Sequence, residues 1–404
     1  MKKIILSKAA IFIIISFMFI SISSCHKNLP VVYNAQSYPG NNYPDLFEAF
    51  WNGMNNNYVF WSIDSTNWDN VYIRYKPIFA QLTVFDTSSE NKAEKYFAQM
   101  TSGLIDSHYN LTFESTGNTF SPSVTRRYTI DPNYFIDSIF PIKGLNALVS
   151  SKYIDSSSLI TGTDFIMSGS SSTVFSAISG TIGNEILYLY FNSFEMSKAG
   201  PNTTPVLNFF FNTVRNLPAN IKGIIIDLRG NGGGEVIDLD YLVGQMVNAQ
   251  YTFGYTRTKN GTGRLDYTPW APAVVKPWNG GSDISVPIVA LGDHLSTSMA
   301  EITTMAIKAL PNGKYIGTRT WGATGPVAPD EYYNGGPFTI GVPAWGNAGY
   351  LSVYTSAAMF KYINGDIYEG AGVPPDIYAS ETYSAYANNH DLVVDAAINY
   401  INTH

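Results

Sequence analysis

The fold class that the sequence predicts is α/β, and the prediction rests on the second half of the 404-residue chain. Short apolar runs alternate there with stretches of helical length and period, which is typical of βαβ units around a parallel sheet. The run from Gly223 to Leu228 is apolar apart from Asp227 near its end, as in a buried parallel strand. The expected strands are 186–191, 223–228, 287–291 and 314–317, and the expected helices are 206–217, 237–247 and 297–310.

The first half of the chain has different patterns. Apolar residues recur at three- and four-residue steps from Leu46 to Met54 and again from Tyr72 to Leu82, which predicts helices. A stretch rich in Ser, Thr and Gly follows, and its short alternating runs predict strands and loops. The expected divisions are an N-terminal helical region at 44–111, a β-rich middle region at 112–182 and an α/β core at 183–404.

Residues 1–24 have the layout of a secretory signal peptide, with a charged start, an apolar middle and small residues at the end. Lys8 leaves the uninterrupted apolar part shorter than the roughly 20 residues of a membrane span. Cys25 directly follows two serines, which resembles a bacterial lipobox and predicts a lipid on Cys25. A simple secretory peptide that ends near a cysteine is the alternative.

The lipid would attach the protein to a membrane of the bacterial cell envelope, with residues 25–43 as a polar tether. His26 and Lys27 are not an obvious inner-membrane retention signal, so the outer membrane is the preferred location.

The composition excludes several other classes of function. The net charge is only −7 and no basic patch stands out, so no nucleic-acid partner is expected. Cys25 is the single cysteine, so the chain cannot form an internal disulfide. The five histidines are far apart in the sequence, so neither a metal site nor a cofactor is expected. The oligomeric state does not follow from the sequence.

Three hydroxyl residues lie between the strand at 287–291 and the helix that follows it. At such a junction the unpaired amides of the helix N-terminus can stabilise an oxyanion, so a hydroxyl there is a candidate nucleophile. Serine and threonine are also ordinary helix caps, and spacing alone does not choose among the three. They are Ser296, Thr297 and Ser298.

Three other segments carry candidate partners for that nucleophile. Gly232, Gly233 and Gly234 follow a buried strand and can present backbone amides, and the absence of a following Lys-Ser/Thr pair argues against phosphate. His108 lies in a polar break after a helix and is a candidate base. Its rival is His294, four residues before Ser298. The last segment, Tyr368 to Asp376, places a glutamate in a Gly/Pro-rich bend. Each segment alone is more often a turn or a structural residue.

Together, these motifs resemble the tail-specific, or C-terminal-processing, serine peptidase family, whose α/β core is crotonase/ClpP-like. The strand and loop at 223–234, the segment at 297–302, the turn at 317–322 and the ending at 369–376 match the family's motifs in order. The resemblance implies that Ser298 is the nucleophile, with Ala300 in place of a second serine. It also implies a polypeptide substrate and backbone amides of Gly233 and Met299 at the oxyanion, with Gly232 as the near alternative.

One departure from the family pattern changes the expected mechanism. Processing peptidases place a lysine base directly after the turn at 317–322, where this chain has Ala323. The tricorn-like branch of the family instead uses a Ser-His pair from an N-terminal segment and a glutamate near the C-terminus. Ser107 and His108 match the pair and Glu369 matches the glutamate. The resemblance therefore implies that His108 is the base, with Ser107 and Glu369 orienting the imidazole.

Many family members carry a PDZ domain where this chain has its β-rich middle region. The usual Gly-Leu-Gly type of carboxylate loop is not found there, so a true PDZ domain and a degenerate or replaced one both stay open. The expected function is a cell-envelope serine endopeptidase that acts on extended or unfolded polypeptides. The alternatives are an inactive peptide- or ligand-binding protein of the same fold and a small-molecule esterase or amidase.

Overall fold

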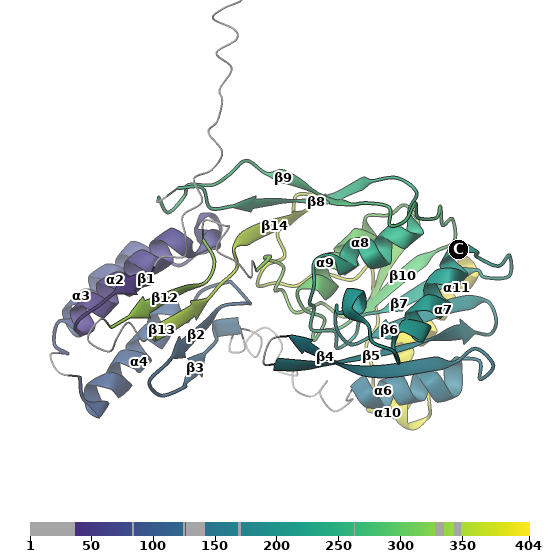
Figure 1. Ribbon diagram of the computed structural model, residues 1–404, viewed down its shortest axis with the longest axis horizontal. Coiled ribbons are helices and arrows are strands. Elements are labelled where there is room, and N and C mark those ends of the chain that lie inside the picture. The colour runs from purple at the N-terminus through teal and green to yellow at the C-terminus, as the bar shows by residue number, and fades with distance from the viewer. Residues whose placement is uncertain are drawn as a thin grey trace, which may run out of the picture.

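The computed structural model describes residues 37–82, 85–123, 126, 142–168, 171–261, 263–327, 335–342 and 349–404. The predicted signal peptide, Cys25 and most of the predicted tether lie outside these residues. The described residues form a larger lobe with the α/β core and a smaller N-terminal lobe, and a long three-stranded sheet runs across both of them (Figure 1). None of the described helices combines the length and the apolar character that crossing a membrane requires.

The larger lobe is built on a seven-stranded sheet with the strand order β15-β11-β10-β7-β6-β5-β4. The five strands from β15 to β6 are mutually parallel, and β5 and β4 continue the sheet antiparallel. The α/β prediction is therefore confirmed. The strands are β4 Ile160–Ser168, β5 Ser171–Ile182, β6 Ile186–Phe191, β7 Gly223–Asp227, β10 Ile288–Gly292, β11 Gly313–Gly317 and β15 Ile377–Tyr378.

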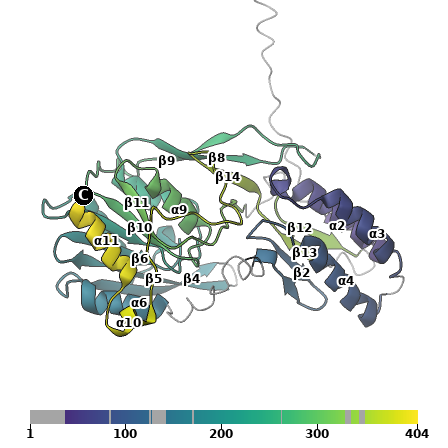
Figure 2. The ribbon, with the colours of Figure 1, turned by 180° about the vertical axis from the view of Figure 1, so that it is seen from behind.

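Both faces of the central strands β6, β7 and β10 are buried, which explains the continuous apolar runs in their sequence. Ile224 and Ile226 of β7 pack on one face with α7, α8 and α9, whereas Ile225 packs on the other face with α11. Figure 2 shows α11 and α6 from that second side. The helical elements are α6 Ile142–Leu148, π-helical η3 Val149–Tyr153, η4 Met196–Lys198, α7 Thr204–Arg215, α8 Asp238–Val243, η5 Gly244–Met246, α9 Met299–Lys308, α10 Tyr383–Ala387 and α11 Leu392–Thr403.

The middle region differs from the prediction because its long strands belong to the core sheet. β5 pairs with β6 along its length and β4 pairs with β5, so these residues do not form a PDZ-like unit of their own. Phe175 and Ala177 of β5 join the α7 side of the core, whereas Ile178 and Ile182 pack on the opposite side. A strand that is apolar on both faces extends a buried sheet, and the core therefore begins well before residue 183.

The N-terminal lobe packs three helices on a five-stranded sheet with the order β1-β12-β13-β2-β3. Two of these strands, β12 and β13, come from beyond residue 337, so the predicted helical region at 44–111 is completed by distant parts of the chain. β1 lies within the predicted tether and pairs with β12, so the last residues of that tether belong to the fold. The elements are β1 Ser37–Pro39, α2 Tyr43–Asn57, η1 Val59–Ser62, α3 Trp68–Phe79, α4 Thr87–Thr101, β2 Asn110–Phe113, β3 Thr119–Phe120, β12 Phe338–Gly341 and β13 Gly349–Tyr354.

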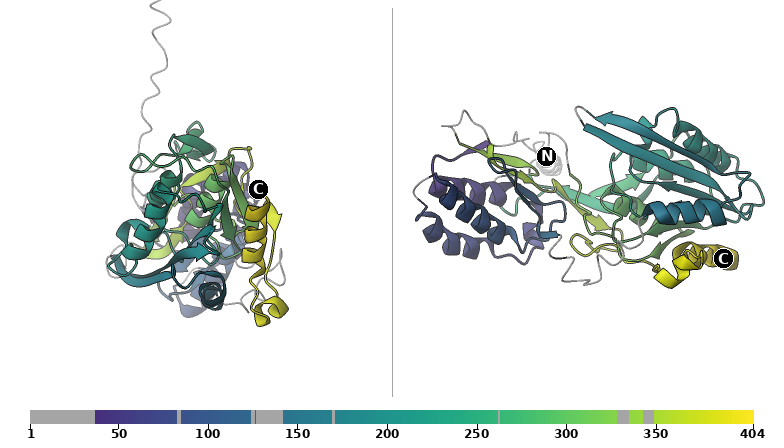
Figure 3. Two further views of the ribbon diagram at one scale, coloured as in Figure 1. Left: turned by 90° about the vertical axis from the view of Figure 1, so that its right-hand side faces the viewer. Right: turned by 90° about the horizontal axis from the view of Figure 1, so that it is seen from below.

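The third sheet lies across the two lobes and has the order β14-β8-β9. Its strands are β8 Tyr251–Thr258, β9 Ala271–Val275 and β14 Ala358–Tyr362. The view from below shows the two lobes side by side with chain passing between them (Figure 3, right). The N-terminal end of α9 and the start of β2 meet near this junction, which is where the predicted site residues lie.

Candidate active site

Ser298 occupies the N-cap position of α9, directly after the loop that follows β10. Its backbone has φ 58° and ψ −116°, a left-handed conformation that is unusual for a residue with a side chain. Strain of this kind persists only where the surroundings enforce it, and it clusters at functional sites. A strained strand-to-helix turn is also how α/β hydrolases expose a nucleophilic serine.

The structure separates the three candidate hydroxyls. Ser296 is buried, donates to the Leu228 carbonyl over 2.8 Å and accepts from the Asp293 amide over 2.9 Å, so it holds the loop together. Thr297 donates to the Leu295 carbonyl two residues earlier, over 3.0 Å. Thr297 and Ser298 both line a cavity of about 530 Å³, but of the three residues Ser298 has the strained backbone. Of the three, Ser298 therefore has the geometry of a nucleophile.

Glu301 fixes the turn on which Ser298 lies. Its buried carboxylate accepts the Ser298 amide over 3.0 Å, the Ala323 amide over 2.7 Å and the Gly322 amide over 2.6 Å. The Thr320 hydroxyl is a fourth donor, over 2.6 Å. Burial raises the pKa of Glu301, and these four hydrogen bonds oppose the rise. Glu301 thus connects the Ser298 turn to the loop at residues 320–323 through hydrogen bonds.

At position 323, where the processing peptidases have a lysine base, this chain has an alanine. Ala323 is fully buried and lines the same cavity as Ser298. Lys308 pairs with Asp376 and donates to the Pro374 carbonyl over 3.2 Å, and the Lys314 ammonium lies 5.6 Å from the centre of the Tyr400 ring. Neither lysine lines the cavity, so neither is placed to act as a base toward Ser298.

His108 lies just before β2 in the N-terminal lobe and lines the same cavity as Ser298. Burial lowers the pKa of His108, and the nearby Asp106 carboxylate opposes this shift. The imidazole is therefore held as the neutral base near neutral pH. The described side chains of Ser298 and His108 do not hydrogen-bond to each other, and such contacts often form only with bound substrate.

Ser356 lies beside the Nδ1 atom of His108, and the sequence analysis did not identify this serine. Ser356 Oγ lies 3.5 Å from His108 Nδ1 and donates to Asp106 Oδ1 over 3.0 Å. Asp106 is fully buried and also accepts the Ser356 amide, the Thr355 hydroxyl and the His108 amide. Ser356 lies between β13 and β14 without a recognisable motif, so no signal in the sequence pointed to it.

Ser107 and Glu369 hold the backbone next to His108. Glu369 is buried, accepts the Ser107 amide over 2.7 Å, and accepts the Thr324 and Gly325 amides over 2.8 and 2.7 Å. Burial raises the pKa of Glu369 well above its usual range, and Asp106 adds to the rise. Ser107 Oγ accepts from Arg126 over 2.5 Å. None of these described bonds reaches the imidazole, so the direct orienting role of Ser107 and Glu369 stays a prediction.

The glycine loop lies against Ser298, but the predicted role of the Gly233 amide as an oxyanion donor does not fit the structure. The Gly233 amide donates to Asn231 Oδ1 over 2.9 Å, so it is not available to an oxyanion in this conformation. Gly232 and Met299 both line the cavity. Gly233 has φ 91°, and a Cβ there would lie 2.7 Å from the Ser298 Cβ. The loop therefore needs glycine to approach Ser298, and Gly232 and Met299 remain as the candidate oxyanion donors.

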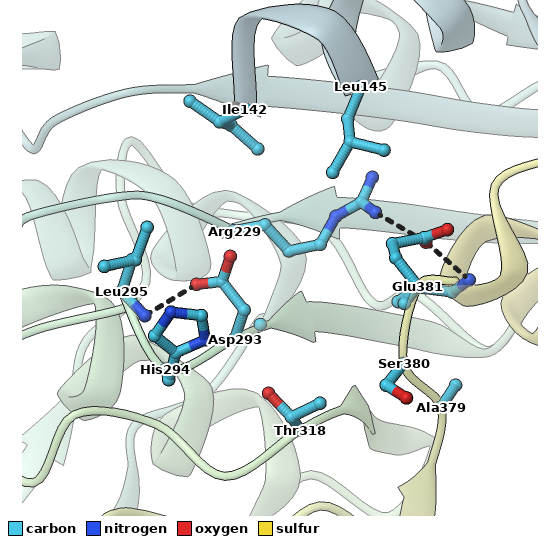
Figure 4. Close-up of a pocket in the computed structure, with 12 residues that line it drawn as sticks. Ile142, Leu145, Arg229, Asp293, His294, Leu295, Thr318, Ala379, Ser380 and Glu381 are labelled. Carbon is cyan, nitrogen blue, oxygen red and sulfur yellow. Dashed lines mark hydrogen bonds and ion pairs between the residues drawn. The ribbon is translucent and has the colours of Figure 1, made fainter. Parts of the chain in front are cut away.

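His294 lines a different, smaller pocket, of about 50 Å³. Figure 4 shows its ring beside Asp293, with the Arg229 and Glu381 side chains farther along the same pocket. It does not line the Ser298 cavity, so the geometry favours His108 over His294 as the base. Within the part of the chain that the structure describes, no three His, Cys, Asp or Glu side chains are grouped as metal ligands.

Comparison with known proteins identifies the domain to which this site belongs. Residues 185–379 match the model of Peptidase family S41. The chain carries a peptidase family S41 domain. The matched residues run from β6 to β15 and include the glycine loop, the Ser298 turn and Glu369. The resemblance found in the motifs is thus confirmed at the level of this peptidase domain.

Curated relatives match slightly less than half of the chain. Putative tricorn protease homolog 2 of Streptomyces coelicolor is 26% identical over 188 residues, which is 46% of this chain and 14% of that protein. Tricorn protease of Thermoplasma acidophilum is 27% identical over 192 residues, which is 48% of this chain and 15% of that protein. The chain therefore spans about one seventh of the length of these relatives.

Solved structures extend the likeness to most of the chain. A putative peptidase from Parabacteroides merdae has a TM-score of 0.65 and 23% identity, and the match covers 89% of this chain and 97% of that one. Mature CPAF complexed with lactacystin has a TM-score of 0.59 and 11% identity, with 90% and 99% covered. At these identities the likeness concerns the fold, and it includes both lobes.

Proposed function

We propose that the protein is a serine endopeptidase that hydrolyses peptide bonds of extended or unfolded polypeptides. The observation that carries this proposal is that Ser298 and His108, from different lobes, line one cavity. Ser298 has the strained backbone of an exposed nucleophile, and His108 has the lowered pKa of a neutral base. The S41 domain supports peptide bonds as the target.

In the proposed reaction, His108 takes the hydroxyl proton of Ser298 as the oxygen attacks the peptide carbonyl carbon. The amides of Met299 and Gly232 donate to the oxyanion that forms. The C–N bond then breaks as His108 gives its proton to the leaving amine, and the acyl group stays on Ser298. Water, deprotonated by His108, hydrolyses this ester and restores the serine.

Glu369 and Ser107 act in this proposal through the position of His108. Glu369 joins the Ser107 amide to the amides of Thr324 and Gly325, and so ties the histidine segment to the turn beside the cavity. Ser356 completes the arrangement from the Nδ1 side of the imidazole.

An activity-based fluorophosphonate probe tests the nucleophile and the base together. We expect labelling of the wild type and no labelling of Ser298→Ala, because the probe phosphonylates the activated serine. His108→Ala should lower peptide turnover by roughly 10²–10⁴-fold, the usual contribution of a general base. His294→Ala is the matched control and should keep turnover. Labelling that survives Ser298→Ala, or full activity of His108→Ala, would refute the assignment.

The same experiment separates the competing functions. A folded wild type that neither takes the probe nor cleaves unfolded protein would favour a binding protein, which Ala323 in place of the family lysine makes a serious alternative. Probe labelling with hydrolysis of small acyl esters, but without cleavage of any polypeptide, would favour an esterase or amidase.

We further propose that the protein is a lipoprotein of the cell envelope, anchored through Cys25 and preferably in the outer membrane. The support is the sequence of residues 1–25, with its charged start, apolar middle and lipobox-like end. Labelled palmitate should enter the wild type and not Cys25→Ser, and membrane fractionation should find the wild type in the outer-membrane fraction. A wild type without lipid would refute the anchor.

A further inference from the structure

The cavity beside Ser298 extends from the nucleophile to the sheet β14-β8-β9. Met299 and Ile302 of α9 line it on the side of the nucleophile. Phe253, Phe360 and Ala273 line it from the sheet. The first residues of α9 therefore connect the reacting hydroxyl directly with an apolar space.

Strand register explains why the sheet side of the cavity is both apolar and open. Thr256 is paired with Phe360, and Gly254 is paired with Ala273. Directly paired residues of antiparallel strands project from the same face, so Phe360 and Ala273 share the face that lines the cavity. Gly254 has no side chain there, and a Cβ at this position would lie 2.4 Å from Phe360 Cζ. The Phe360 ring therefore packs over Gly254, and the small Ala273 side chain leaves room beside this aromatic wall.

The residues that line the cavity indicate which substrate side chains it can bind. Among the described residues that line the cavity there is no Asp, Glu, Lys or Arg. A charged substrate side chain would lose its water there without gaining an ion pair, which is costly. A volume of about 530 Å³ lies within the usual range of ligand sites, and its walls suit a large apolar group.

We propose that this cavity is the subsite for the substrate residue whose carbonyl Ser298 attacks, and that it selects large apolar side chains such as Leu, Met and Phe. That residue becomes the acyl group on Ser298, so its side chain has to lie in the space next to the hydroxyl throughout the reaction. The inference rests on the proposed peptidase function and adds its specificity.

Matched peptides that differ only at this position test the proposal. We expect kcat/KM for Phe or Leu to exceed that for Ala by at least roughly tenfold, in line with the selectivity of apolar pockets for each added methylene. Peptides with Lys or Asp should be cut more slowly than the Ala peptide. Equal or faster cleavage of the Lys or Asp peptides would overturn the proposal, as would a preference found only for the residue after the cleaved bond.

A substitution inside the cavity supplies the second test. Ala273→Phe fills part of the space and should lower the Phe-to-Ala ratio of kcat/KM by roughly tenfold, while cleavage of the Ala peptide persists. Ala271→Phe is the matched control, because it lies two residues along the same strand, is exposed and does not line the cavity. An unchanged ratio in Ala273→Phe, or the same loss in Ala271→Phe, would overturn the proposal.

Fluorophosphonate labelling keeps this result distinct from the proposed function. An Ala273→Phe variant that is still labelled but has lost its preference supports the subsite assignment. A wild type that is labelled and cuts peptides without preference overturns the subsite and leaves the peptidase function standing. A folded wild type that is never labelled overturns both.

Discussion

Ser356→Ala tests whether a hydroxyl between Asp106 and His108 controls the catalytic imidazole. Ser356 Oγ donates to Asp106 Oδ1 over 3.0 Å and lies 3.5 Å from His108 Nδ1 and 3.3 Å from the Gly325 carbonyl. When its proton is directed to Asp106, the oxygen can accept the Nδ1–H of the imidazole. The Nε2 lone pair is then the one available to take a proton from Ser298.

The expected effect comes from the charged state of the ring. The distance of 3.5 Å makes a weak bond to neutral His108, but an imidazolium is a stronger donor. A hydrogen bond to a charged group contributes about 1.5–3 kcal/mol, so its loss in the transition state should lower kcat/KM by roughly 10- to 100-fold. The acid limb of the pH profile should also move to lower pH, because removing an acceptor of Nδ1–H destabilises the protonated ring.

Peptide cleavage measured across pH is the assay, with Thr355→Val as the matched control. Thr355 donates to the same carboxylate over 2.6 Å but is not bonded to the imidazole. Its variant should lose about 1–3 kcal/mol of unfolding free energy with an unchanged acid limb. Wild-type kcat/KM and pH profile in Ser356→Ala would refute the reasoning, and so would an identical acid-limb shift in Thr355→Val.

Three further predictions concern the base, the turn and the core. The His108 imidazole has to be neutral to accept a proton, and burial lowers its pKa. As the pH is lowered, kcat/KM should therefore begin to decrease only below the usual histidine pKa of about 6.5. A decrease that begins above this pH would contradict the role of His108. Ser296→Ala should still take the fluorophosphonate probe but lose about 1–3 kcal/mol of unfolding free energy in urea denaturation, because the buried Leu228 carbonyl and the Asp293 amide each lose a bond; an unlabelled but folded variant would return attention to Ser296. Arg229→Met should lose about 3–5 kcal/mol, because two buried carboxylates lie within 2.9 Å of its guanidinium, whereas Lys222→Met breaks an exposed pair and should lose less than about 1 kcal/mol; equal losses would contradict the account of the buried network.

The sequence predicted best what is decided locally. The run at 223–227 is apolar on both faces of a strand and became β7, and the stretch after β10 became the turn and α9. The resemblance to a family then selected Ser298 from three hydroxyls, a choice for which the structure supplies a reason in the strained backbone.

The sequence did not predict the N-terminal sheet or Ser356, because both depend on pairing between distant segments of the chain. β12 and β13 complete a sheet with β1 and β2, more than 200 residues away in the chain, and no local pattern encodes that partner. The same holds for Ser356, which reaches Asp106 only because β13 places it there. Gly233 differs for a local reason, since the Asn231 side chain two residues earlier takes its amide.

The proposed use of a histidine base in place of a lysine accounts for the buried polar groups that surround residues 106–108. A lysine next to the turn would reach the nucleophile from the same lobe, but His108 has to be held across the junction from a short segment before β2. Two buried carboxylates hold successive amides of this segment, since Glu369 accepts from Ser107 and Asp106 accepts from His108. Glu369 also accepts the amides at 324 and 325, and Asp106 also accepts the amide at 356. Each carboxylate thus ties the histidine segment to a different loop, which fixes the backbone that carries the His108 side chain. The proposed site therefore depends on the packing of both lobes, and Ala323 is compatible with the proposed activity because the proposed base comes from the other lobe.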